Sequence, residues 1–156
     1  MRYVTKVLQS GENVMAIGRL HWIIYGHALG LLFLSIILFL IGSSTRDSWP
    51  GLSFGIWIAA FVFLAAALII GARAWFDQWS TEIAVTNRRV IVKRGFIKRR
   101  TAEMNMDKIE SVTATQSIVG RLLNYGTVHI RGTGEGLEQL HGISAPIELR
   151  NCITAR

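Results

Sequence analysis

The stretch IIYGHALGLLFLSIILFLI, which runs from Ile23 to Ile41, contains no lysine, arginine, aspartate or glutamate and decides the class of this protein. In an α-helix it measures about 28 Å, close to the thickness of the hydrocarbon layer of a bilayer. A second uncharged stretch, LSFGIWIAAFVFLAAALIIGA, runs from Leu52 to Ala72. The two stretches predict two membrane-spanning helices.

The connector between the stretches, GSSTRDSWPG, is rich in Gly and Ser and contains one Arg/Asp pair. This composition is typical of a tight turn at the water interface, so residues 23–76 are predicted to form an antiparallel membrane hairpin. A cleaved signal peptide is disfavoured, because the first stretch follows a segment of 22 residues and exceeds the usual apolar region of a signal.

The distribution of basic residues predicts the orientation of the hairpin. Arg2, Lys6 and Arg19 precede the first stretch, Arg46 is the single basic residue of the connector, and Arg73 follows the second stretch. Basic flanks stay in the cytoplasm, so both termini are predicted to be cytoplasmic. Tryptophans suited to interfacial belts flank the stretches: Trp22, Trp49, Trp75 and Trp79.

Residues 77–156 contain short β-branched segments separated by glycines, such as TEIAVT, RVIVKRG and TVHIRG. Val128 and Ile130 alternate with His129 and Arg131, as in a strand with one buried face. Several such strands on one chain indicate an antiparallel sandwich or barrel. Pro146 suits the first turn of a short terminal helix. The predicted division is therefore a cytoplasmic N-terminal segment, 1–22, a two-helix hairpin, 23–76, and a mainly-β cytoplasmic domain, 77–156.

The sequence QSIVGRLLNYGTV, from Gln116 to Val128, together with DKIESV, from Asp107 to Val112, resembles the bacterial membrane-flanked pleckstrin-homology-like family, the YdbS-like proteins. LQSGE, from Leu8 to Glu12, extends the resemblance to the segment before the hairpin. The resemblance implies a seven-stranded, partly open barrel with a C-terminal helix, in a multi-pass protein of the bacterial inner membrane. It implies no particular activity.

A basic run, NRRVIVKRGFIKRR, begins at Asn87, and its lysines and arginines are candidates for binding anionic lipid headgroups: Arg88, Arg89, Lys93, Arg94, Lys98, Arg99 and Arg100. Each such residue near an anionic surface contributes about 1 kcal/mol, and a tether between Ala72 and Asn87 would keep the run within reach. A role in setting topology and an ordinary solvated face remain alternatives. Nucleic acid is disfavoured, because aromatic residues do not interleave with the charges.

Small residues recur four apart on both stretches, at Gly26 and Gly30 on the first and at Gly55 and Ala59 and Ala67 and Gly71 on the second. Such spacing lets helices approach closely, either within the hairpin or between copies of the chain. His27 also lies within the first stretch, where a structural hydrogen bond and a functional role are both open.

A homo-oligomer is predicted from the short terminal helix, which would leave apolar sheet surface uncovered. An apolar projection between strands is predicted to supply that contact, with Ile118, Val119, Leu122 and Leu123 as its candidates. The alternative, above all for Leu122 and Leu123, is that these residues fill the barrel's own core.

The sequence predicts neither an enzyme nor a metal or cofactor site. The histidines are scattered, and Cys152 is the lone cysteine, so no metal-ligand spacing occurs. RGTGEG lacks the Gly-Lys-Ser/Thr ending of a phosphate loop.

The function predicted first is an interaction and assembly module at the membrane surface, with an unidentified membrane or cytoplasmic protein as partner and anionic lipid as an accessory contact. The alternatives are a headgroup sensor that uses the basic run, and an accessory subunit of a membrane enzyme or transport complex.

Overall fold

The computed structural model describes residues 4–95, 100–133 and 136–155. These residues divide into two compact units, one made of Met1–Ile23 with Asp77–Arg156 and the other of Ile24–Phe76. Below, the first is called the β domain and the second the helical unit.

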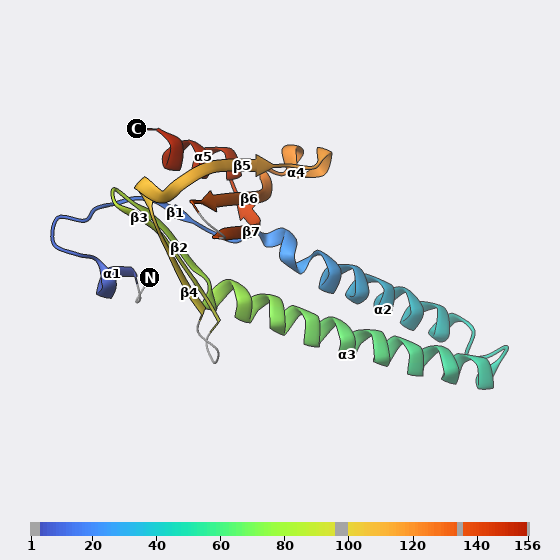
Figure 1. The fold of residues 1–156 in the computed structure, drawn as a ribbon. Helices are drawn as coiled ribbons and strands as arrows, with labels where there is room; N and C mark the ends of the chain where they lie inside the picture. The colour runs from blue at the N-terminus through green and yellow to red at the C-terminus, as the bar shows by residue number, and fades with distance from the viewer. Residues whose placement is uncertain (1–3, 96–99, 134–135, 156) are drawn as a thin grey trace. The chain divides into compact units, whose positions relative to one another are not determined.

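Helices and strands follow one another in this order (Figure 1): α1 Val4–Val7, β1 Val14–Gly18, the 3-10 helix η1 Trp22–Tyr25, α2 Gly26–Ser44, α3 Pro50–Ser80, β2 Glu82–Thr86, β3 Arg89–Arg94, β4 Arg100–Asn105, the 3-10 helix η2 Met106–Lys108, β5 Ile109–Thr115, α4 Ile118–Leu122, β6 Tyr125–Gly132, β7 Leu137–Ser144 and α5 Pro146–Thr154.

The helical unit contains α2 and most of α3, and both helices are long and apolar enough to cross a membrane. Within the helical unit, their buried positions are small residues that recur every seven positions: Ala28, Ser35 and Gly42 on α2, and Ser53, Ala60, Ala67 and Ala74 on α3. The Ser35 hydroxyl donates to the Ala60 carbonyl at 2.8 Å. A Cβ at Gly42 would lie 2.5 Å from Trp57 Cδ1. Small side chains at this period therefore let the two helices approach closely.

The β domain contains two antiparallel sheets, with strand orders β1-β2-β3-β4 and β5-β6-β7. β1 pairs with β2 from Val14 opposite Thr86 to Gly18 opposite Ile83. The helical unit is thus inserted in the chain between two neighbouring strands of one sheet. The sequence-based division differs here, because it placed 1–22 outside the β domain. The partner of β1 lies beyond both long helices, where no local pattern reveals it.

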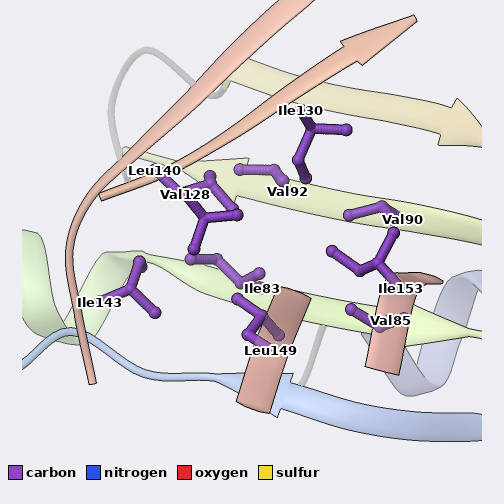
Figure 2. Close-up of a cluster of buried hydrophobic side chains, with 10 residues drawn as sticks. All are labelled: Ile83, Val85, Val90, Val92, Val128, Ile130, Leu140, Ile143, Leu149 and Ile153. Atoms are coloured by element: carbon purple, nitrogen blue, oxygen red, sulfur yellow. The ribbon is translucent and has the colours of Figure 1, made fainter. Parts of the chain in front are cut away.

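The core lies between the two sheets and beneath α5 (Figure 2). It is formed by alternate residues of β2, β3 and β6, by two residues of β7 that are three positions apart, and by two residues of α5: Ile83, Val85, Val90, Val92, Val128, Ile130, Leu140, Ile143, Leu149 and Ile153. Full burial of each such side chain contributes about 1.5–3 kcal/mol, so this cluster accounts for the packing of α5 on the sheets.

The two sheets meet at one corner, where the chain after β1 runs beside β7. Leu20 forms a bridge with Ile143, and the amide of His21 donates to the Gly142 carbonyl at 2.7 Å. Within the described residues no strand pairs with the outer edge of β4.

The predicted partly open barrel is therefore corrected, because the two sheets are not closed into a barrel. Near the end of β4, in the part of the chain that the structure describes, the two sheets are connected by a side-chain contact of Met104 and not by backbone hydrogen bonds between strands. The sulfur of Met104 lies 3.2 Å from the Cβ position of Gly132.

Candidate functional site

Arg89 opens β3 and is the centre of a charged cluster, here called the Arg89 cluster, made of Glu12, Thr86, Arg89 and, at its exposed side, Glu103. Its Nε donates to Glu12 Oε1 at 2.9 Å and its Nη2 to Glu12 Oε2 at 2.9 Å. Nη1 donates to Glu103 Oε2 at 2.7 Å. The two bonds to Glu12 form the bidentate pair that matches a guanidinium to a carboxylate.

Glu12 reaches this position from the turn before β1, in which Gly11 has a φ of 78°. Its carboxylate also accepts from the amide of Gln9 at 2.9 Å and from the hydroxyl of Thr86 at 2.7 Å. Its side chain is fully covered, and that of Arg89 is 11% exposed. The hydrogen bonds from Arg89 outweigh burial and lower the pKa of Glu12 from 4.5 to about 2. The cluster therefore fastens the segment before β1 to β2 and β3.

Other residues of the basic run are also matched with carboxylates. Lys93 Nζ lies 3.7 Å from Glu82 Oε1, and Arg94 Nη2 lies 3.6 Å from Glu138 Oε1. Arg94 also donates to the Gln139 carbonyl. Three of the seven predicted headgroup ligands, Arg89 among them, are thus committed to ion pairs within the β domain.

The remaining members of the basic run divide into two groups. Arg88 and Arg100 are exposed. Lys98 and Arg99 lie outside the described residues. Of the seven candidate headgroup ligands, the structure therefore shows two, Arg88 and Arg100, as exposed.

A hollow of about 350 Å³ opens beside β4, and it is here called the β4 groove. Its apolar lining comes from both sheets: Val90, Val92, Ala102, Met104 and Ile130. Thr101, Glu103, Gly136 and Glu138 complete it. Its volume falls in the range of pockets that hold ligands. The sequence did not indicate this groove, because it depends on how two separate sheets face each other.

The model of the Bacterial PH domain family matches residues 23–155 of the chain. The protein belongs to the bacterial PH domain family. Domains of this kind are protein-interaction or lipid-binding modules. No curated protein and no solved structure matches the chain significantly.

In this bacterial PH domain protein, one predicted small-residue pair lies at the α2–α3 contact, because Ala67 is buried and a Cβ at Gly71 would lie 3.6 Å from Ala28 Cβ. The other predicted glycines lie away from that contact. A Cβ built at Gly26, Gly30 or Gly55 meets nothing within 4 Å among the described residues. Ala59 is half-buried and His27 is exposed. Gly26, Gly30 and Gly55 therefore do not lie in the contact between α2 and α3, and a contact between copies of the chain at these glycines stays a prediction.

The same bacterial PH domain protein exposes α4, as the sequence suggested for Ile118 and Val119. Ile118 is 90% exposed and Val119 54%, and Leu122 on the next turn is 85% exposed. These values place α4 among the most apolar exposed features of the β domain.

Proposed function

We propose that this protein is a non-enzymatic module, anchored in the bacterial inner membrane with both termini in the cytoplasm, that binds an extended apolar segment of another polypeptide in the β4 groove. The observation that carries the proposal is the groove itself, an apolar hollow beside a strand edge that no described strand covers.

An uncovered strand edge presents backbone donors and acceptors to a partner, and an extended peptide can add to it as a further strand. Side chains of such a peptide point alternately into and away from the groove. Ala102 and Met104 would contact the inward ones. The carboxylates of Glu103 and Glu138 are already paired with arginines, so the groove favours apolar side chains over charged ones.

The anchoring rests on the two apolar helices and on the way the chain leaves them. The sequence suggested a tether between Ala72 and Asn87, but α3 continues to Ser80 and β2 begins at Glu82. The β domain is also joined to the helical unit through the residues after β1. The two short connections support the proposal because they limit how far the β domain can move from the membrane that the helices would cross.

The headgroup-sensor alternative is weaker in this structure, because Arg89, Lys93 and Arg94 are paired with carboxylates. The accessory-subunit alternative makes the same demand on the groove as an assembly module, since in both cases the groove holds a segment of a partner.

A peptide-library selection against the full chain in lipid nanodiscs tests the proposal. We expect enrichment of extended peptides with alternating apolar residues. Their binding should weaken about tenfold or more in Ala102→Trp, which fills the groove, because the apolar contacts are lost. The matched control is Thr113→Trp, an exposed position on β5.

Near-ultraviolet circular dichroism establishes that both variants keep their fold. The proposal is overturned if no peptide is enriched, or if the enriched peptides bind Ala102→Trp as tightly as the parent chain.

A further inference from the structure

α4 exposes apolar side chains, and hydrogen bonds from neighbouring residues fix the conformation of this short helix. The Ser117 hydroxyl caps the helix by accepting from the amide of Gly120 at 3.0 Å. The side-chain amide of Gln116 donates to the carbonyls of Gly120 and Tyr125 at 3.3 and 3.2 Å. A Cβ at Gly120 would lie 2.6 Å from the Tyr125 carbonyl oxygen, so this position requires glycine. The exposure of Ile118 and Leu122 is therefore a built feature of the loop.

The support of α4 lies at the end of the β domain where the chain enters the first long helix. The ring of Tyr125, at the start of β6, stacks on the ring of His21 with centroids 5.2 Å apart. The His21 ring in turn lies 5.3 Å from the ring of Trp22. Leu122 is three residues before Tyr125, so the chain places it within about 11 Å of that residue.

The chain returns from the second long helix at the same end. The side-chain amide of Gln78 donates to the Leu20 carbonyl at 3.4 Å. Trp22 is 52% exposed and Trp79 63% exposed, beside these two crossings. Tryptophan is enriched at membrane interfaces, where its amphipathic ring sits among the headgroups. This end of the β domain therefore combines both crossings, two exposed tryptophans and α4.

The charge around α4 also suits an anionic surface. Between Ser111 and Thr133 the sequence contains no aspartate or glutamate, and Arg121 lies exposed between Val119 and Leu122. An apolar tip with a basic residue beside it is typical of elements that lie in the headgroup region.

We propose that α4 inserts Ile118, Val119 and Leu122 into the headgroup and acyl boundary of the membrane that α2 and α3 cross, with Arg121 at the lipid phosphates. The inference rests on the proposed membrane anchoring and is independent of the β4 groove. The bilayer is favoured over a second copy of the chain because both crossings lie beside α4. Since the two spans would already hold the β domain at the membrane surface, a small apolar contact suffices to fix the orientation of the domain relative to the bilayer.

Depth-dependent fluorescence quenching tests the contact. The full chain carries Cys152→Ser and Leu122→Cys labelled with a polarity-sensitive fluorophore, in nanodiscs of phosphatidylcholine and phosphatidylglycerol. We expect a blue-shifted emission and about twofold quenching by lipids with a nitroxide near the headgroup, as for groups buried at this depth.

Two matched labels complete the experiment. Ser111→Cys lies exposed on β5, about 14 Å of strand before the end of β5 at Thr115, and should stay unquenched. Phe33→Cys, at a 66% exposed position of α2, should be quenched by a nitroxide deep in the acyl chains. Adding Ile118→Ser should reduce the quenching at position 122.

Each contrary outcome is distinct. An unquenched label at 122 with a quenched label at 33 overturns the α4 contact and leaves the anchoring intact. A blue-shifted label at 122 that lipid nitroxides do not reach indicates a protein contact, such as a second copy, and also overturns the proposal. An unquenched label at 33 overturns the anchoring and the α4 contact together.

Discussion

Glu12 lies in the interior of the β domain with its carboxylate fully covered, whereas Ile118 lies on the surface of the same domain and is 90% exposed. One region buries a charge and the other exposes apolar side chains, and both are the reverse of what is usual in proteins. They differ in whether other residues of the chain form contacts with these side chains. Glu12 has hydrogen bonds from Arg89, Thr86 and Gln9. Among the described residues the tip of α4 has no cover of this kind. The chain itself explains the buried charge, whereas the exposed apolar tip is what the proposed membrane contact would cover.

The largest expected effect comes from removing the carboxylate. Glu12→Ala leaves the Arg89 guanidinium buried with only Glu103 as a charged partner, so we expect the free energy of unfolding to fall by about 3–4 kcal/mol. Urea unfolding in mild detergent, followed by near-ultraviolet circular dichroism, measures the change.

The matched control is Glu110→Ala, an exposed glutamate on β5, which should change the free energy of unfolding by under about 0.5 kcal/mol. Equal losses in the two variants would contradict the assignment of Glu12 as a structural fastening.

Acid should remove the same contribution. The folded-state pKa of Glu12, about 2, lies below its ordinary value of 4.5 because Arg89 donates to the carboxylate. The stabilisation is therefore complete well above pH 4.5 and is lost as the pH falls toward 2, and it amounts to about 3 kcal/mol. Unfolding of the parent chain and of Glu12→Gln should be compared across this range. A gap between them that stays constant down to pH 2 would show that the carboxylate charge is not its source.

The smallest effect is expected on α4. Leu122→Ala should change the free energy of unfolding in detergent by under about 0.5 kcal/mol, because the side chain is 85% exposed. Leu140→Ala, at a fully buried position of the core, is the matched leucine and should cost about 2–5 kcal/mol. A large loss for Leu122→Ala would mean that α4 supports the fold of the β domain, and the comparison with the Arg89 cluster would then fail.

The sequence predicted the features that depend on neighbouring residues. Apolar length identified both long helices, alternation identified strands such as β6, and the motif from Gln116 to Val128 identified the family. The apolar character of α4 was also visible, because Ile118 and Val119 interrupt a polar stretch between strands.

What it missed depends on partners far apart in the chain. Glu12 and Arg89 are separated by 77 positions, so a local count treated Arg89 as an available charge. β1 pairs with a strand that follows both long helices, so its five residues carried no recognisable signal. The spacing of Gly26 and Gly30 suggested a seam, but the contact between the helices uses residues seven apart.

The insertion of the helical unit between β1 and β2 gives the order of synthesis a physical role. β1 leaves the ribosome before either long helix, and its partner strand leaves after both. If α2 and α3 cross a membrane, the sheet of β1 to β4 can form only when both helices have inserted, because β2 then lies on the same side of the membrane as β1. A chain that inserts only one of the two helices would place β1 and β2 on opposite sides of the membrane, and Glu12 would then have no contact with Arg89. If α2 and α3 cross a membrane, completion of the sheet would thus depend on the correct insertion of both helices.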